Sequence, residues 1–213
     1  MYKAILFDLD DTLLDHQGAL RDGVDEWCVS LGLPTGQHAR FRELEKKWFA
    51  AYERGEVSHP GQRAGRCRDF LDRPEMTEAE ALAAYDGYLA AYAHNWRAFP
   101  DALPVLERAH AAGLKVGVLT NGAREMQQGK LAATGLDLDF VVLIPTVELG
   151  TPKPHREAYL AACSIMESSP AETLMVGDSL ANDVEGARAA GLDALWFDRA
   201  GHGDLASLDE LTF

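Results

Sequence analysis

The stretch AILFDLDDTLLD, residues 4–15, decides the fold. It begins with four apolar residues and continues with four aspartates, Asp8, Asp10, Asp11 and Asp15. A short apolar run of this kind predicts a buried β-strand, here over residues 3–9. Carboxylates this close together repel one another, so the end of a buried strand is an unfavourable place for them unless a cation compensates their charge.

The chain beyond residue 100 alternates between apolar strands and helices. Strands are predicted over residues 114–121, 139–144, 173–178 and 193–197, and helices over residues 102–113, 123–135, 155–163 and 180–191. Such alternation is typical of an α/β fold. The sequence therefore predicts a Rossmann-like parallel sheet with helices on both faces, to which the first strand belongs.

Between these two parts the pattern is helical. Two stripes of large apolar side chains recur at helical spacing, namely Phe41, Leu44, Trp48 and Tyr52, and then Leu82, Tyr85, Leu89 and Tyr92. This spacing indicates helix packing rather than a cofactor site. Glycine and proline interrupt the pattern in residues 54–70, where we expect a loop or a short helix. We therefore expect a core of residues 1–14 and 97–213, with an inserted α-helical cap of residues 15–96.

Composition excludes several classes of function. The formal net charge of −14 argues against binding of a nucleic acid polymer or an anionic membrane. No stretch approaches the length of a membrane span, and we expect a cytoplasmic protein. The cysteines show no CxxC spacing and suggest neither disulfides nor a zinc site; they are Cys28, Cys67 and Cys163.

Polar residues follow three of the predicted strands. The first strand ends at Asp8 and Asp10, the second at Thr120 and Asn121, and the fourth at Asp178. Ligands of open parallel sheets bind beyond the carboxyl ends of the strands, so these groups are expected at one edge. Closely placed carboxylates with oxygen ligands suit Mg²⁺, which predicts a site of Asp8, Asp10 and Asp178. Asp11 and Asp15 are expected to be turn or cap residues instead.

Three further residues are candidates for the same site. Thr120 and Asn121 precede a helix, where a hydroxyl and main-chain N–H groups can bind an anion such as phosphate, although an ordinary helix cap is equally possible. Lys153 lies between two prolines, and it is either a fixed charge toward phosphate or the acidic cluster, or a solvated lysine. Asp183 could hold Lys153 or a metal-bound water, or could simply favour a helix N-terminus.

Four segments in order, FDLDDTLLD, LTNG, KP and VGDSLANDVEGARAAG, resemble the signature motifs of the haloacid dehalogenase-like hydrolase superfamily. The insertion after the first motif resembles the helical cap of one subfamily. The resemblance implies that Asp8 is a nucleophile forming an aspartyl-phosphate and that Asp10 is a general acid and then a base. It also implies Mg²⁺ held by Asp8, the main-chain carbonyl of Asp10 and Asp178, with Thr120 and Lys153 binding the phosphoryl group.

We therefore expect a Mg²⁺-dependent phosphatase that acts on a small phosphorylated metabolite. A phosphomutase and a 2-haloacid dehalogenase of the same fold are alternatives, and Asp10 argues against the dehalogenase because family members with that activity do not use such an acid. A non-catalytic binding protein is a further alternative. Cap arginines either contact an anionic substrate or pair with nearby carboxylates on a solvated face; they are Arg54, Arg63, Arg66, Arg68 and Arg73.

Overall fold

The computed structural model describes residues 1–213, apart from the side chain of Glu53. Its centre is a five-stranded sheet in the order β3-β2-β1-β4-β5, in which every adjacent pair is parallel. The strands are β1 (Ala4–Phe7), β2 (Lys115–Thr120), β3 (Val141–Pro145), β4 (Thr173–Gly177) and β5 (Asp193–Trp196). The first strand is therefore central, which agrees with the complete burial of its side chains.

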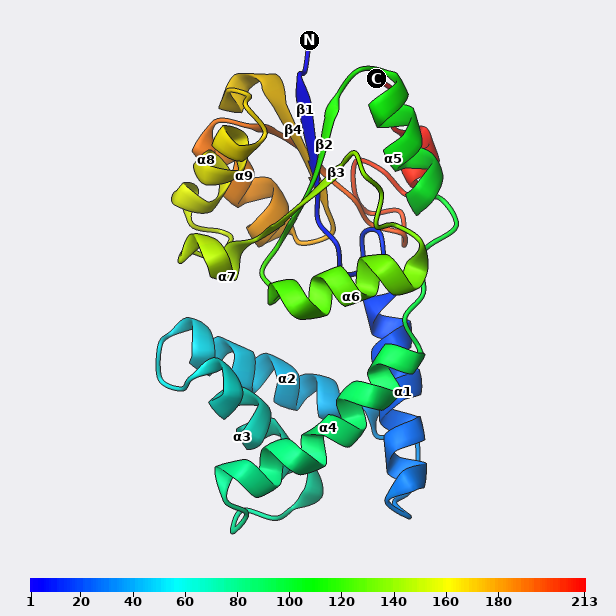
Figure 1. Ribbon diagram of the computed structural model, residues 1–213, viewed down its shortest axis with the longest axis vertical. Helices are drawn as coiled ribbons and strands as arrows, with labels where there is room; N and C mark the ends of the chain where they lie inside the picture. The colour runs from blue at the N-terminus through cyan, green and yellow to red at the C-terminus, as the bar shows by residue number, and fades with distance from the viewer. The chain divides into compact units, whose positions relative to one another are not determined.

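Helices cover both faces of this sheet (Figure 1). Side chains alternate between the faces of a strand, so Ile5 and Phe7 pack with α5 and α6, whereas Ala4 and Leu6 pack with α8 and α9. The helices of this part are α5 (Ala102–Ala111), α6 (Arg124–Thr134), α7 (Thr146–Leu149), α8 (Arg156–Ile165) and α9 (Gly186–Ala190). The predicted parallel sheet with helices on both faces is confirmed.

One predicted helix differs in form from the expectation. The continuous helix expected over residues 180–191 is divided into a π-helical turn, η2 (Leu180–Glu185), and α9. Two short 3-10 turns, η1 (Pro170–Glu172) and η3 (Leu208–Glu210), complete this part. Wider turns of the π type often occur at functional sites, and η2 carries Asp183.

The chain divides into two compact units, one of residues 1–16 and 97–213 and one of residues 17–96. The smaller unit is formed by helices α1 (His16–Ser30), α2 (His38–Glu53), α3 (His59–Leu71) and α4 (Glu78–His94). The first residue of α1 belongs to the larger unit, which ends this segment at residue 16. Its centre is an aromatic cluster in which ring centroids lie 4.4 to 6.4 Å apart, formed by Trp27, Phe41, Phe70, Tyr85 and Tyr88. No helix among the described residues is long and apolar enough to span a membrane.

Helix α3 is longer than the loop or short helix expected over residues 54–70. It has 13 residues, and the Ser58 hydroxyl caps it by accepting a hydrogen bond from the Gly61 N–H. Pro60 lies in the first turn, where proline is tolerated. A Cβ at Gly65 would lie 2.6 Å from the Trp48 ring, so this glycine allows close packing on α2. Pro60, Gly61 and Gly65 thus belong to the helix instead of interrupting it.

The cap arginines mostly have partners within the smaller unit. Arg66 is buried, and its guanidinium donates to Glu45 at 2.7 Å and to the Tyr85 hydroxyl at 2.8 Å. Three others pair locally, as Arg54 with Glu56, Arg73 with Glu75, and Arg68 with the main-chain carbonyl of Met76. The exposed pair of Arg54 with Glu56 is one that the solvated alternative expected, whereas the burial of Arg66 was not expected. Contact of any cap arginine with substrate stays a prediction.

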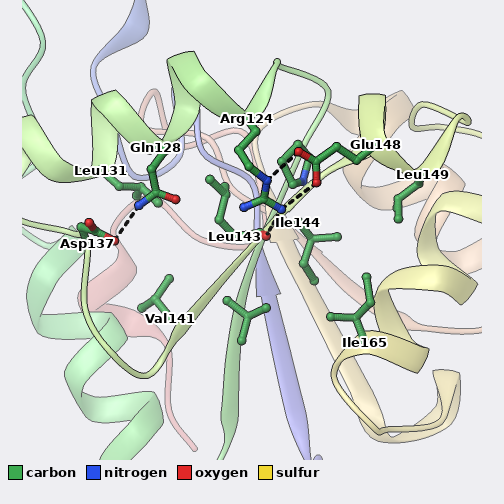
Figure 2. A pocket seen from close by; sticks show the side chains of 12 residues that line it. Arg124, Gln128, Leu131, Asp137, Val141, Leu143, Ile144, Glu148, Leu149 and Ile165 are labelled. Carbon is green, nitrogen blue, oxygen red and sulfur yellow. Dashed lines mark hydrogen bonds and ion pairs between the residues drawn. The ribbon is translucent and has the colours of Figure 1, made fainter.

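The open edge of the sheet, at β3, borders a cavity of about 460 Å³ (Figure 2). Arg124 reaches over this edge, where it pairs with Glu148 at 2.6 Å and donates to the main-chain carbonyl of Leu143 at 3.4 Å. A charged side chain over an edge strand discourages pairing with a strand from another chain. The residues that line the cavity do not include the sequence-predicted site residues, so this hollow is distinct from the predicted site.

The contact between α1 and α4 depends on Gly23. A Cβ at this position would lie 2.8 Å from the Tyr92 Cα, which is backbone and cannot rotate away. We expect Gly23→Ala to destabilise the protein by about 2 kcal/mol, as overpacking does. Urea unfolding measures this, with Val29→Ala at an exposed position of the same helix as the control. An unchanged unfolding midpoint for Gly23→Ala would show that α4 yields to the added methyl group.

Candidate active site

The sheet order brings the predicted site residues together at one edge. β1 lies between β2 and β4, so their carboxyl ends deliver Asp8, Thr120 and Asp178 side by side. The Asp8 N–H donates to the Val176 carbonyl at 2.9 Å, which continues the pairing of β1 with β4 up to the aspartate. The helices α5 and α9, which follow β1 and β4 in this part of the chain, pack on opposite faces of the sheet, and ligands of such sheets usually bind at such a point.

Lys153 joins two of the carboxylates. Its Nζ lies 2.6 Å from Asp8 Oδ1 and 2.6 Å from Asp183 Oδ1, and the lysine side chain is only 3% exposed. Burial alone lowers the pKa of Lys153, but the charges of Asp183 and Asp8 outweigh it and raise the pKa well above the ordinary value. The lysine is therefore a permanent cation at this site, and the predicted pairing with Asp183 is what the geometry shows.

The loop that carries Lys153 is fastened by Asn121. The Asn121 Oδ1 accepts hydrogen bonds from the Lys153 N–H and from the Thr146 hydroxyl, both at 2.8 Å, and its Nδ2 donates to the Lys153 carbonyl at 3.0 Å. These contacts engage both the oxygen and the nitrogen of the Asn121 side-chain amide. For Asn121, a role in phosphate binding is thus left to its main-chain N–H, while its side chain positions Lys153.

Three carboxylates form an acidic cluster at the edge. One oxygen each of Asp8, Asp178 and Asp183 lies within 4.8 Å of the others. Asp178 is held by Thr12, whose hydroxyl accepts from the Asp178 N–H at 3.1 Å. Asp183 accepts from the Ser179 N–H at 3.0 Å, and a Cβ at Gly177 would lie 2.4 Å from its carboxyl carbon. The strand end therefore needs a glycine so that η2 can bring Asp183 into the cluster.

The electrostatics of the acidic cluster favour a cation. Burial, the first cause, and the charges of Asp183 and Asp178 raise the pKa of Asp8 well above its ordinary value, against the pull of Lys153. Burial and the charges of Asp183 and Asp11 raise the pKa of Asp178 to about 7. One lysine does not neutralise three carboxylates. An all-oxygen set of this kind fits Mg²⁺ or a similar hard divalent ion.

Asp10 is held apart from the acidic cluster by helix α6. Lys130 Nζ lies 2.6 and 2.8 Å from its two carboxylate oxygens, and Gln127 Nε2 lies 3.2 Å from Oδ2. Burial raises the pKa of Asp10, but the charges of Lys130 and His16 and these hydrogen bonds lower it to about 2. The Asp10 carboxylate is thus paired with α6, and binding of a metal by the main-chain carbonyl of Asp10 stays a prediction.

Gln127 and Lys130 were not predicted from the sequence. Both are buried, at 1% and 3% exposure, on the face of α6 that also buries Leu131. Positions three and four residues apart usually form the apolar face of a helix, but in α6 two of these positions hold the polar residues Gln127 and Lys130. Polar groups on a face that packs against the sheet are the signal that could have identified them, since buried lysines are rare unless they are paired.

Thr120 completes the group. Its hydroxyl oxygen accepts from Gln127 Nε2 at 2.6 Å and from the Gly122 N–H at 3.3 Å. Because the oxygen accepts in both contacts, the hydroxyl proton is available for another acceptor, such as a phosphate oxygen. Asp11 lies in a turn with a left-handed φ of 64°, as expected, and Asp15 directly precedes α1 and pairs with Arg97 at 2.7 Å.

The raised pKa of Asp178 makes the stability of the metal-free protein depend on pH. The folded-state pKa is about 7 and the unfolded value is 3.8, so the folded protein keeps a proton that the unfolded chain releases between these values. Stability should therefore fall as the pH rises through this window, by about 1.4 kcal/mol per pH unit for this group. Urea unfolding in EDTA at about pH 5 and about pH 7.5 measures the slope, and Asp178→Asn should flatten it. Equal slopes in the two proteins would contradict the assignment.

Comparison with known proteins agrees with this geometry. The family model for haloacid dehalogenase-like hydrolases matches residues 2–191. A phosphoserine phosphatase of Thermus thermophilus is 31% identical, over 92% of this chain and 89% of its own length. Other curated relatives are named glyceraldehyde 3-phosphate phosphatase and phosphoglycolate phosphatase.

Solved structures share the fold. A HAD-hydrolase of Bacillus subtilis bound to magnesium aligns with a TM-score of 0.85 at 24% identity, over 98% of this chain and 96% of that one. The defluorinating L-2-haloacid dehalogenase Rha0230 aligns with a TM-score of 0.74 at 20% identity, over 93% and 82%. These two alignments show the shared fold and do not assign an activity, whereas the curated relatives named above are phosphatases. The chain belongs to the haloacid dehalogenase-like hydrolase family and groups with its phosphatases.

Proposed function

We propose that this protein is a Mg²⁺-dependent phosphatase that hydrolyses a small phosphorylated metabolite through an aspartyl-phosphate on Asp8. The observation that carries the proposal is the separation of two aspartates that are only two residues apart. Asp8 lies with Lys153 in the acidic cluster, whereas Asp10 is bound by Lys130 outside it. A two-step hydrolysis needs this division, because one carboxylate must attack phosphorus and another must transfer protons.

Asp8 is the proposed nucleophile. Lys153 engages its Oδ1, which leaves Oδ2 to attack the phosphorus atom. The Lys153 ammonium and the Thr120 hydroxyl would bind the phosphoryl oxygens and offset the charge that makes attack on a phosphate anion unfavourable. Mg²⁺ bound by Asp8, Asp178 and the main-chain carbonyl of Asp10 would supply further charge neutralisation. Asp183 supports this arrangement by holding Lys153.

Asp10 is proposed to transfer protons in both steps. In the first step it donates a proton to the departing oxygen of the ester, and in the second it takes a proton from the attacking water. Its low pKa, about 2, makes the ionised form dominant, and this is the form that the second step requires. The first step draws on the minor protonated form, so esters with acidic leaving groups should react most readily.

A dehalogenase and a phosphomutase remain the alternatives of the same fold. A dehalogenase would displace halide from carbon and would have no use for a proton-transferring Asp10. A phosphomutase would return the phosphoryl group to a second hydroxyl of a sugar, and a sugar-phosphate isomerisation assay distinguishes it. The proposal of a small metabolite as substrate is supported by the curated phosphatase relatives, which act on phosphorylated amino acid, triose and glycolate compounds by name.

Replacing the nucleophile tests the first step. We expect Asp8→Asn to lower phosphate release from p-nitrophenyl phosphate to background, because an amide cannot form the acyl phosphate. Asp137→Asn, an aspartate of the same unit that bonds Gln128 on the surface, is the matched control and should keep full activity. Turnover by Asp8→Asn comparable to that of the unchanged protein would exclude Asp8 as the nucleophile.

Removing divalent ions tests the metal. We expect EDTA to abolish phosphate release and Mg²⁺ to restore it, and we expect Mg²⁺ to raise the melting temperature of the unchanged protein more than that of Asp178→Asn. The melting curves report binding independently of turnover. Hydrolysis of p-nitrophenyl phosphate in EDTA would overturn the metal requirement, and metal-independent release of halide from a 2-haloacid would favour the dehalogenase.

A further inference from the structure

Helix α6 contacts both Thr120 and Asp10, the two groups that would take part in hydrolysis of the aspartyl-phosphate. Gln127 Nε2 donates to Thr120 Oγ1 at 2.6 Å and to Asp10 Oδ2 at 3.2 Å, and Lys130 Nζ contacts both Asp10 oxygens. We call Gln127 and Lys130 the α6 clamp. Because one amide group contacts both the threonine and the aspartate, the clamp sets the separation between a phosphoryl-binding hydroxyl and a proton acceptor.

Burial shows that the α6 clamp acts from behind the site. The Lys130 side chain is 3% exposed and Gln127 is 1% exposed, whereas the Asp10 side chain is 30% exposed. The lysine therefore cannot reach a water or a substrate itself. The Asp10 carboxylate is the more exposed partner of this ion pair, so an effect of Lys130 on the reaction would act through Asp10.

Each of the two aspartates has its own lysine, and the lysines come from different parts of the chain. Lys153 follows α7 and holds Asp8, while Lys130 on α6 holds Asp10 with two contacts. An ion pair in which one nitrogen contacts both oxygens restricts rotation of the carboxylate. Without it, the Asp10 carboxylate would lose its two short contacts and keep the longer one to Gln127 at 3.2 Å.

A purely structural role for the α6 clamp fits less well. Gln127 Oε1 is buried and has no hydrogen-bond partner among the described residues. A buried acceptor without a partner destabilises the folded state, and an apolar side chain of the same size would avoid this. The residue is therefore poorly suited to fastening α6 to the turn after β1, whereas its Nε2 is well placed to orient Thr120 and Asp10.

We propose that Lys130 and Gln127 are positioning residues that hold the Asp10 carboxylate for hydrolysis of the aspartyl-phosphate. The inference rests on the proposed function. In this step the oxygen of water attacks phosphorus, the bond from phosphorus to the Asp8 oxygen breaks, and Asp8 leaves as a carboxylate. Asp10 takes the proton that the water loses, and inorganic phosphate is released. The position of Asp10 relative to the bound phosphoryl group therefore controls the lifetime of the intermediate.

Rapid-quench kinetics with p-nitrophenyl phosphate separates the two steps. Release of p-nitrophenolate reports formation of the aspartyl-phosphate, and acid-quenched protein reports its decay by mass spectrometry. For Lys130→Met we expect formation of the intermediate to be nearly unchanged and its decay to slow by about 10- to 100-fold, part of what a positioned general base contributes. A burst of about one p-nitrophenolate per active site should then precede slow turnover.

Two further variants and a control make the test specific. Lys130→Arg keeps the charge and should restore most of the decay rate, and Lys130→Gln serves in place of Lys130→Met if the latter does not fold. Lys115→Met is the matched control, because this lysine lies on the surface of the same unit and pairs with Glu167. It should show the kinetics of the unchanged protein.

Each outcome decides the inference. A long-lived intermediate in Lys130→Met with recovery in Lys130→Arg supports it. Equal slowing of both steps, with a matching loss of thermal stability, means that the α6 clamp is structural and overturns it, as do kinetics equal to those of the unchanged protein. If the unchanged protein itself releases no phosphate with Mg²⁺, the proposed function fails, which is a separate result from failure of the α6 clamp.

Discussion

The arrangement of the site depends on the buried ammonium group of Lys153. It lies 2.6 Å from both Asp8 and Asp183, and all three side chains are at most 10% exposed. Removing one partner of such a buried ionic group typically costs about 3–5 kcal/mol, because charges are left without compensation. The rest of the site follows from this requirement. Asn121 fastens the loop of the lysine, and the η2 turn and Gly177 allow Asp183 to approach it.

A second lysine gives the two aspartates of the first motif different environments. Asp8 lies among carboxylates that raise its pKa, whereas Lys130 lowers the pKa of Asp10 to about 2. The charge of the clustered carboxylates is thus compensated by two cations of the protein itself, Lys153 and Lys130, and a divalent ion is proposed as a third. The pKa values of two side chains only two residues apart are thus shifted in opposite directions, because each side chain contacts a helix or loop from a different, distant part of the chain.

Local patterns were sufficient to predict most of the fold. Apolar runs marked all five strands, and the expected parallel sheet is confirmed by its topology. Patterns failed where a residue depends on a distant neighbour. Gly65 suggested a break, but the ring of Trp48 requires it within α3. Lys130 carried no motif because its partner Asp10 lies 120 residues away, and the contacts of Asn121 with the Lys153 loop likewise form only in the folded chain. The substrate could not be predicted either, because no local sequence pattern identifies the side chains that would contact it.

The identity of the covalently modified residue is the most direct test of the account. The protein is mixed with a phosphate ester and Mg²⁺, quenched in acid, treated with borohydride to reduce the acyl phosphate, and digested for mass spectrometry. The account predicts that reduction converts Asp8, and no other aspartate, into the corresponding alcohol, and that the product is absent when ester is omitted. Modification at Asp10 or Asp178, or active turnover without any modified aspartate, would contradict it.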